Sequence, residues 1–328
     1  MRSLLRSPFL LFTFFVFYAL VFPMSTSAAV NTTLQTPIEI QMIPEVPAPN
    51  ANVLLQTQNV AGKDTALYTW TVNGRVVEQG AGRDRITITA GAIGVRTTVS
   101  VSVSMSGGAV ETRTRTILPG ELDLVWEGNT YTPPFYLGKP LATGDSTVTI
   151  AAFPNLVVSG ARVGASSLVY QWFVNNSQTP YRSGRGLSSI TLSPPLFNSP
   201  FSVRAVASTQ DGTVAVQQSV VIAPQEPEIL FYEKHPLLGT LFNVSLVNPF
   251  QLLEDEVTFR IFPLFVVDPT KTLYSWEVAG DAVTADNSGR ELTLRKTGAG
   301  SGNFLIDTSL ETPNSLYERA SARARIIF

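Results

Sequence analysis

The side chains that could carry out catalysis are few in this sequence of 328 residues. It contains no cysteine and one histidine, His235, which is followed by Pro236. A Ser-His-Asp triad would have to use this imidazole, and no Gly-x-Ser-x-Gly turn exposes a nucleophilic serine. One histidine without thiolates also cannot supply the ligand set of a zinc site. We therefore expect a non-enzymatic protein with no catalytic residues, no metal ligands and no cofactor.

Acidic residues leave two further possibilities. Two carboxylates flanking a bond suffice for glycoside hydrolysis, and carboxylate oxygens suit calcium. The densest acidic group, Glu254-Asp255-Glu256, comes just before a predicted strand, where adjacent side chains point to opposite faces. We interpret this group as a solvated loop. Calcium bound between domains stays open as an alternative, although the sequence has no calcium-binding loop of the helix-loop-helix type.

The overall charge argues against one class of partner. Charged residues make up 15% of the chain, and the formal net charge is −2. Proteins that bind nucleic acid usually present a strongly basic surface that displaces counterions. Nucleic acid is therefore not an expected partner.

Residues 1–29 have the features of a secretory signal peptide. Arg2 and Arg6 precede an apolar run over residues 9–22, and Ser27 and Ala29 supply the small residues of a cleavage site after Ala29. The run is shorter than the roughly 20 apolar residues of a transmembrane helix. We expect an exported mature chain without a membrane span, located outside the cell, at its surface or in the periplasm.

A strand motif that occurs three times sets the architecture in which all these residues sit. The motif Tyr-x-Trp-x-Val is found at residues 68–72, 170–174 and 274–278. The central tryptophans, Trp70, Trp172 and Trp276, lie 102 and 104 residues apart. A repeat of this length predicts one folding unit of about a hundred residues per tryptophan.

The repeat extends to the strands around each tryptophan. Gly-Arg pairs follow at 82–83, 184–185 and 289–290, and alternating strands follow these at 86–88, 190–192 and 292–294. Similar strands precede the motif at 53–58, 148–153 and 257–262. Prolines at 119 and 224 close the first two units. We therefore expect three domains, at residues 30–119, 120–224 and 225–328.

Short runs with period-two alternation, separated by Gly, Pro and Asn, are typical of antiparallel β-sandwiches. The predicted fold class is all-β, with three tandem immunoglobulin-like sandwiches. Residues 320–326 would also suit a helix on propensity alone. We favour a strand there, because the first unit places Arg113 and Arg115 in an alternating run at the same point.

The Tyr-x-Trp-x-Val strand that runs into an Asn-Gly or Gly turn resembles the PKD domain, an immunoglobulin-like sandwich of extracellular bacterial and archaeal proteins. The resemblance covers all three units. It implies a spacer, adhesive or interaction role at the cell surface, and no chemistry. We expect the three repeated tryptophans to fill the sandwich cores and not to stack on ligands.

Two long connections offer candidate partner-binding residues, because loops commonly carry recognition in sandwich proteins. Residues 129–146 and 235–254 lie between the first and second strands of units two and three and are rich in aromatic and apolar side chains. The candidates are Trp126, Tyr131, Phe135, Tyr136, His235, Leu238 and Phe242. A second interpretation is that these segments shield sheet edges or pack between the units.

We therefore predict a scaffold or adhesin-like protein of the cell envelope that acts through protein interaction. The alternative is a polysaccharide-binding accessory protein that recognises surface glycans. Exposed aromatic rings at Trp126, Tyr131 and Tyr136 would favour this alternative, because sugars stack on such rings.

Overall fold

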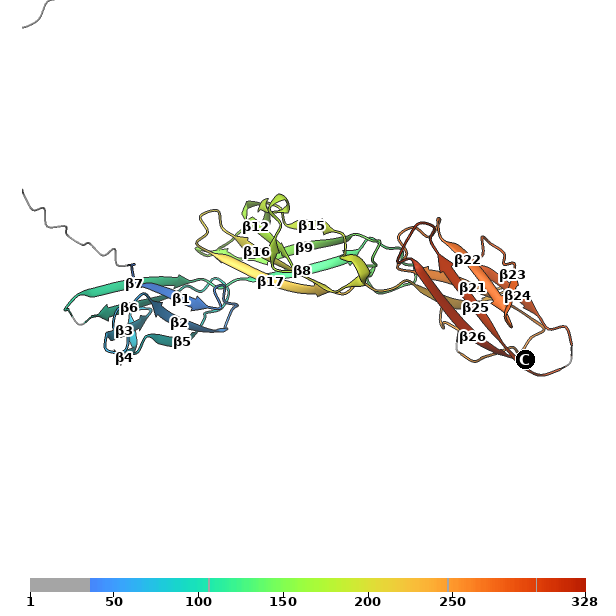
Figure 1. The fold of residues 1–328 in the computed structure, drawn as a ribbon, viewed down its shortest axis with the longest axis horizontal. Coiled ribbons are helices and arrows are strands. Elements are labelled where there is room, and N and C mark those ends of the chain that lie inside the picture. The colour runs from blue at the N-terminus through green and yellow to red at the C-terminus, as the bar shows by residue number, and fades with distance from the viewer. Residues whose placement is uncertain (1–35, 106, 247, 299) are drawn as a thin grey trace, which may run out of the picture. The chain divides into compact units, whose positions relative to one another are not determined.

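The computed structural model describes residues 36–105, 107–246, 248–298 and 300–328. The predicted signal peptide lies outside these residues. Figure 1 shows that the described chain is built almost wholly of strands. In these ranges the helical segments are short 3-10 turns, at Ala165–Ser167, Pro180–Arg182 and Leu196–Asn198. None of the described helices is long and apolar enough to cross a membrane.

The first sandwich has two antiparallel sheets. One has the order β1-β2-β5 and the other the order β4-β3-β6-β7. Their strands are β1 (Glu39–Ile43), β2 (Asn52–Gln58), β3 (Leu67–Val72), β4 (Arg75–Ala81), β5 (Arg85–Thr89), β6 (Thr97–Ser104) and β7 (Val110–Ile117). Strand β6 shows the alternation that builds the core, since Val99, Val101 and Val103 are buried while the serines between them face outwards.

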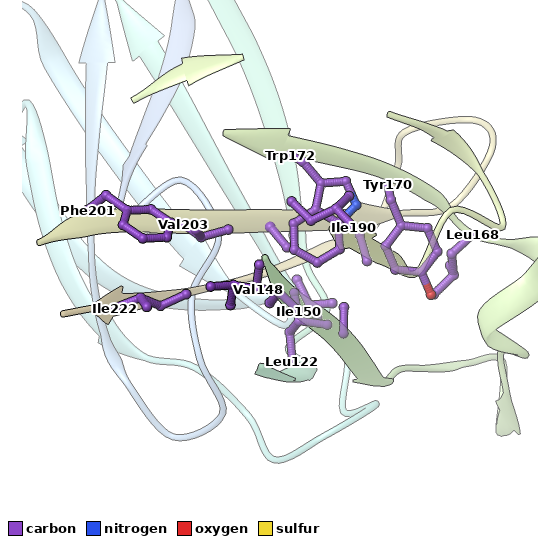
Figure 2. Packing of buried hydrophobic residues seen from close by; sticks show 14 of the residues in the cluster. Leu122, Val148, Ile150, Leu168, Tyr170, Trp172, Ile190, Phe201, Val203 and Ile222 are labelled. Atoms are coloured by element: carbon purple, nitrogen blue, oxygen red, sulfur yellow. The ribbon is translucent and has the colours of Figure 1, made fainter. Parts of the chain in front are cut away.

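The second sandwich repeats this arrangement. One sheet has the order β15-β9-β8 and the other the order β13-β12-β16-β17, with β14 also paired to β12. The strands are β8 (Glu121–Gly128), β9 (Val148–Asn155), β12 (Val169–Val174), β13 (Ser177–Gln178), β14 (Gly184–Arg185), β15 (Ser189–Leu192), β16 (Phe201–Ser208) and β17 (Ala215–Ile222). A separate small hairpin joins β10 (Val157–Val158) to β11 (Ala161–Arg162). Figure 2 shows side chains of both sheets meeting in its core.

The third sandwich has the sheets β19-β18-β21-β24 and β20-β26-β25-β22-β23. The strands are β18 (Glu228–His235), β19 (Gly239–Thr240), β20 (Phe250–Gln251), β21 (Glu256–Leu264), β22 (Leu273–Val278), β23 (Asp281–Val283), β24 (Glu291–Arg295), β25 (Asn303–Glu311) and β26 (Arg319–Ile327). The short strand β20 pairs in parallel with the end of β26, while β25 pairs with β26 along its whole length. The all-β prediction, including a strand over residues 320–326, is confirmed.

The repeated tryptophans lie at the centre of the three cores. Trp70 and Trp172 are 0% exposed and Trp276 is 2% exposed, as expected for side chains that fill a sandwich. Each indole N–H donates to a main-chain carbonyl of a glycine turn; in the first and third sandwiches this turn holds the repeated Gly-Arg pair, and in the second it holds Gly186 and Leu187, just after the Gly184-Arg185 pair of β14. The acceptors are Arg83 at 2.8 Å for Trp70, Leu187 at 2.9 Å for Trp172 and Gly289 at 2.7 Å for Trp276.

Glycine shapes the turns that present these carbonyls. Gly82 and Gly289 have φ values of +67° and +81°, which residues with a Cβ adopt only with strain. A Cβ at Gly82 would also lie 3.0 Å from the Asp64 carbonyl oxygen. In the second sandwich the matching glycine is Gly186, with a φ of +72°, so the turn that receives the indole requires a glycine there and not the Gly184-Arg185 pair.

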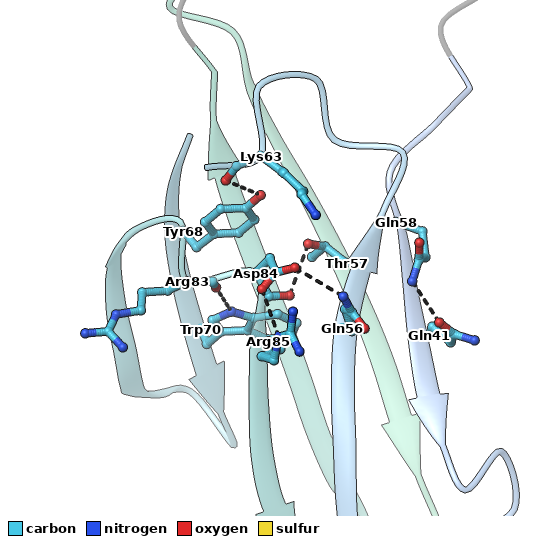
Figure 3. A network of polar contacts seen from close by, with 10 residues as sticks. All are labelled: Gln41, Gln56, Thr57, Gln58, Lys63, Tyr68, Trp70, Arg83, Asp84 and Arg85. Atoms are coloured by element: carbon cyan, nitrogen blue, oxygen red, sulfur yellow. Dashed lines mark hydrogen bonds and ion pairs between the residues drawn. The ribbon is translucent and has the colours of Figure 1, made fainter. Parts of the chain in front are cut away.

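The residues around Trp70 form a polar network at the edge of the first core (Figure 3). Asp84 follows the turn and is buried. Its carboxylate accepts hydrogen bonds from Gln56 and Arg85, both at 3.1 Å. Burial alone would raise the pKa of Asp84, but these two donors outweigh it and lower the pKa. The carboxylate thus fixes the chain as it leaves the turn and enters β5.

Two-residue turns follow the three tryptophan strands, and the first turn position is asparagine in two sandwiches and alanine in the third. Asn73, Asn175 and Ala279 occupy the first turn position with φ values of 50°, 47° and 53°. The Asn73 side chain accepts the amide N–H of Thr98 at 2.9 Å, and that of Asn175 accepts the amide of Ser202 at 3.0 Å. Alanine offers no such acceptor and adopts a positive φ with strain.

Replacing Trp172 with alanine should destabilise the second sandwich by about 3 to 5 kcal/mol, because a large buried side chain leaves a cavity. Trp172→Phe retains most of the side-chain volume but leaves the Leu187 carbonyl without its hydrogen bond, which should lower the stability by about 1 to 3 kcal/mol. Calorimetry of the full chain measures both effects. One transition should move while the others stay in place. A Trp172→Ala variant that melts like the unaltered protein would contradict the core assignment.

Ala279→Asn should stabilise the third sandwich by about 1 kcal/mol, since asparagine tolerates positive φ and adds a side-chain acceptor. The turn already donates the Ala279 N–H to the Leu305 carbonyl at 2.9 Å, as the matching asparagines do in the other sandwiches. Ala282→Asn, within β23, is the control and should not stabilise. Urea unfolding of the full chain distinguishes the two variants, and an Ala279→Asn variant of lowered stability would refute the expectation.

Candidate interaction surface

Trp126 lies on β8 with its side chain packed against the second core. The Lys139 ammonium lies 3.2 Å from the centroid of its ring, a cation–π contact. Burial lowers the pKa of Lys139. The sequence placed Trp126 among rings that could stack on a ligand. The ring is half-buried, packs on the second core and lies under Lys139, and its role in binding a ligand stays a prediction.

The segment that follows β8 packs against the third sandwich. Tyr131 donates its backbone N–H to the Val266 carbonyl at 2.6 Å and accepts the N–H of Phe265 at 2.8 Å. The Tyr131 ring lies against the third core. The ring of Tyr136 contacts that of Phe265 at a centroid distance of 5.7 Å. These two predicted site residues are therefore engaged within the chain.

Phe135 enters an aromatic cluster on the sheet formed by β18 and β21. Its ring centroid lies 5.2 Å from Tyr232, 4.4 Å from Phe242 and 5.1 Å from Phe262. We call these four residues the aromatic cluster. Phe242 comes from the connection after β19, so residues of both long connections meet here. In residues 131–136 the aromatic rings are half-buried against the third sandwich, and their role in binding a partner stays a prediction.

A charged network lies on the same sheet beside the aromatic cluster. Glu291 is 8% exposed. Its carboxylate lies 2.8 Å from the Lys234 ammonium, 3.5 Å from Arg260 Nε and 3.1 Å from Asn287 Nδ2. Burial would raise the pKa of Glu291, but the hydrogen bonds from Lys234 and Asn287 outweigh it and lower the pKa. The carboxylate is therefore held ionised between two cations, and it joins β24 to β18 and β21 of the same sheet.

His235 ends β18 and holds a tight turn. Its Nδ1 accepts the backbone N–H of Leu237 at 3.1 Å and that of Leu238 at 3.2 Å. An imidazole nitrogen that accepts two amides caps the turn. The histidine therefore acts by shaping the loop that carries the two leucines.

The connection after His235 exposes apolar side chains. Leu237 is 90% exposed, Leu238 73%, Val244 55% and Phe242 46%. We call these four residues the apolar tip. No charged residue occurs from Pro236 to Leu253. Exposed apolar patches on soluble domains commonly mark interaction surfaces. Phe242 belongs to both the apolar tip and the aromatic cluster.

The sequence missed two exposed side chains. Leu237 is more exposed than the predicted Leu238, and Tyr181 on the second sandwich is 100% exposed. Leu237 follows Pro236, and Tyr181 follows Pro180. A proline before an apolar residue in a turn was the available signal, since such turns run over the surface.

The acidic group at residues 254–256 divides between a loop and a strand. Glu254 and Asp255 are exposed in the loop, while Glu256 opens β21 and pairs with Arg295 Nε at 2.8 Å. Across the parts of the chain that the structure describes, His, Cys, Asp and Glu form no group of three able to hold a metal ion. This acidic group is a solvated surface feature.

No family model matches the sequence, and no curated protein matches it. Solved structures with similar folds include the central fibronectin-III array of RIM-binding protein, 16% identical, with 90% of this chain and 97% of that chain covered and a TM-score of 0.32. Three N-terminal domains of the bacteriophage RB49 outer capsid protein Hoc are 14% identical, covering 89% and 98%, with a TM-score of 0.24. At these identities the likeness is one of fold class alone.

A third solved structure is the SGBP-B protein of the Bacteroides ovatus mixed-linkage glucan utilization locus, in complex with a heptasaccharide. It is 13% identical, covers 89% of this chain and 70% of that chain, and has a TM-score of 0.20. The strands and sheets of this chain by themselves make it all-β, with immunoglobulin-like sandwiches.

Glu291→Gln should make the stability of the protein less dependent on pH in the acid range. The folded-state pKa of Glu291 lies below its ordinary value of 4.5, so its stabilisation is present above that pH and is lost as the pH falls through the folded pKa. The free energy of unfolding of the variant should be about 1 to 3 kcal/mol lower at pH 7. It should also fall less steeply than that of the unaltered protein as the pH is lowered.

Glu311→Gln is the matched control. Glu311 pairs with Arg319 at 3.0 Å on an exposed surface, where ion pairs contribute about 0 to 1 kcal/mol. Calorimetry of both variants from pH 3 to 7 provides the measurement. Equal losses in the two variants would show that the Glu291 network is no more important than a surface pair.

Proposed function

We propose that the protein is a non-enzymatic scaffold or adhesin-like protein outside the cytoplasm and acts by binding other envelope proteins. The observation that carries this proposal is the apolar tip. Five large apolar side chains, the four of the apolar tip and Leu253, are exposed in the described part of a connection that holds no charge, which is costly unless a partner covers them. The immunoglobulin-like and fibronectin-III-like sandwiches are compatible with such a binding role.

The structural roles of the distinctive residues support a role in binding. The repeated tryptophans, the Gly-Arg turns and the lone histidine all have structural roles in the described residues. Tyr131, Phe135 and Tyr136 pack within the chain, which leaves the apolar tip as the exposed part of the predicted surface. A partner with an apolar patch of its own would bury these side chains at about 25 cal/mol per Å².

Three finer statements belong to the same proposal. Residues 1–29 direct export and are removed, so the mature protein lies outside the cell, at its surface or in the periplasm. The chain divides into domains at residues 30–119, 120–224 and 225–328. The sandwiches are related to PKD domains, as the Tyr-x-Trp-x-Val strands suggest. Surface glycans are the alternative partners, for which Tyr181 offers a fully exposed ring.

A photo-crosslinking residue placed at Leu238 tests this proposal directly. In the native envelope it should form a crosslink to a protein, and Leu237→Ser combined with Val244→Ser should remove at least about nine tenths of that product, because the apolar contact is lost. The same residue placed at Tyr181 is the control and should form no specific crosslink.

A glycan array run with the same protein separates the alternative. Binding to a glycan that is lost in Tyr181→Ala and kept in the Leu237→Ser, Val244→Ser variant would replace the proposal with a polysaccharide-binding role. Absence of any crosslink from residue 238 would also contradict it.

A further inference from the structure

A hollow with a volume of about 460 Å³ lies in the third sandwich, beside the chain end marked C in Figure 1. Its apolar lining consists of Leu252, Val278, Leu294, Phe304 and Phe328. Sites for small molecules are commonly hollows of about 300 to 1,000 Å³ with a mostly apolar lining and few polar groups. The hollow has the size and the lining of such a site.

Both sheets of the third sandwich contribute to this lining. Leu294 lies on β24 of one sheet, and Val278 and Phe304 lie on β22 and β25 of the other. The rings of Phe304 and Phe328 contact each other at a centroid distance of 5.7 Å. All four side chains pack against the third core. The hollow is therefore an opening at the end of this core, between the two sheets.

The matching end of the core is closed in the other two sandwiches. The strand that follows the glycine turn and pairs with each tryptophan strand places one side chain there, four residues before the partner of the tryptophan. This residue is Thr97 in the first sandwich, Phe201 in the second and Phe304 in the third. Thr97 and Phe201 are buried, whereas Phe304 is only partly buried. The third core thus leaves open a position that the other two bury.

The last strands show the same difference. The isoleucine that pairs with each of these residues is followed, two positions later, by Pro119, Pro224 and Phe328. Both prolines are buried, and Phe328 is only partly buried. Apolar surface that faces water costs free energy. The opening of this core therefore points to an occupant of the hollow.

Two cations lie at the hollow, and they differ in their partners. Arg295 and Lys296 both line it. Arg295 Nε donates to the Glu256 carboxylate at 2.8 Å. The Lys296 ammonium lies 5.8 Å from the centroid of the Phe328 ring, and in the described part of the chain it forms no ion pair. The hollow therefore combines apolar walls with a positive charge that an anion could neutralise.

We propose that this hollow binds the alkyl chain of a fatty acid, with the carboxylate beside the Lys296 ammonium. The alkyl chain would cover the exposed parts of Phe304 and Phe328 and would need no hydrogen bonds from the walls. The proposal goes beyond the binding of an envelope protein, because it assigns a small-molecule ligand. The four residues of the apolar tip are not among those that line the hollow, so the two proposals are independent.

Other occupants match the hollow less well. A peptide would bring backbone N–H and C=O groups and a sugar would bring hydroxyl groups, and such groups are costly to bury without partners. The polar side chains of the lining are those of Arg295, Lys296 and Thr297, and Arg295 is already paired with Glu256. A cation would be repelled by Lys296. An anion with an apolar chain is the class that fits both the walls and the charge.

Calorimetric titration of the full chain with dodecanoate, below the concentration at which it forms micelles, tests the proposal. One equivalent should bind, at least about tenfold more tightly than decanoate, because each buried methylene strengthens binding about fourfold. Decanol should bind more weakly than decanoate, since it lacks the carboxylate that pairs with Lys296.

Variants locate the bound molecule. Lys296→Gln should weaken the binding of decanoate at least about threefold and leave that of decanol unchanged. Lys271→Gln is the matched control, because Lys271 pairs with Asp268 at 3.2 Å and does not line the hollow. Val278→Trp should fill the hollow and abolish the binding of dodecanoate, and a melting curve shows whether this variant is folded.

Absence of dodecanoate binding to the unaltered chain would overturn the proposal, as would binding that persists unchanged in both Lys296→Gln and Val278→Trp. Loss of binding in the Leu237→Ser, Val244→Ser variant would place the molecule on the apolar tip and would also overturn it. If Val278→Trp does not fold, the comparison of decanoate with decanol in Lys296→Gln decides by itself.

Discussion

The hydrogen bond from a buried indole to a carbonyl of the glycine turn before the next strand is the interaction on which the rest of the structure depends. Each tryptophan lies on a central strand of one sheet, and each acceptor lies just before a strand of the opposite sheet. The bond therefore joins the two sheets of every sandwich at its centre. In many immunoglobulin domains a disulfide joins the sheets beside the core tryptophan, and this chain has no cysteine.

Because the strands are committed to folding, the surfaces free for recognition lie in connections and at the open end of the third core. The two sandwiches with long connections use them differently. Residues 131–136 are packed on the third sandwich by Phe135 and Tyr131, so they stabilise the chain. The connection after His235 contributes Phe242 to the same packing and leaves Leu237 and Leu238 in solvent. Phe242 thus belongs both to the packed aromatic cluster and to the exposed connection.

Much of the fold could be predicted from the sequence, because the deciding signals are local or repeated. Alternation in residues 97–104 and in 319–327 fixes which side chains face the core. The spacing of Trp70, Trp172 and Trp276 fixes the number of cores. The role of the Gly-Arg pair as a turn was expected too, although its carbonyl acceptor function was not, since the indole N–H reaches it across the sandwich.

The candidate surface was harder to predict, because coverage depends on residues far apart in the chain. Phe135 contacts Tyr232, Phe242 and Phe262, and no local sequence pattern predicts these contacts. Lys139 covers Trp126 from a loop that could equally have pointed away. Composition identifies aromatic and apolar connections, but only the packed structure separates rings that are used internally from side chains left exposed.

Hydrogen exchange at the indole N–H groups, followed by NMR, tests the central claim most directly. Trp126 is an internal reference, because among the described residues its indole N–H donates to no carbonyl. The account predicts that the indole protons of Trp70, Trp172 and Trp276 exchange only when their sandwich unfolds, at least about a thousandfold more slowly than that of Trp126. Exchange of all four at similar rates would contradict it.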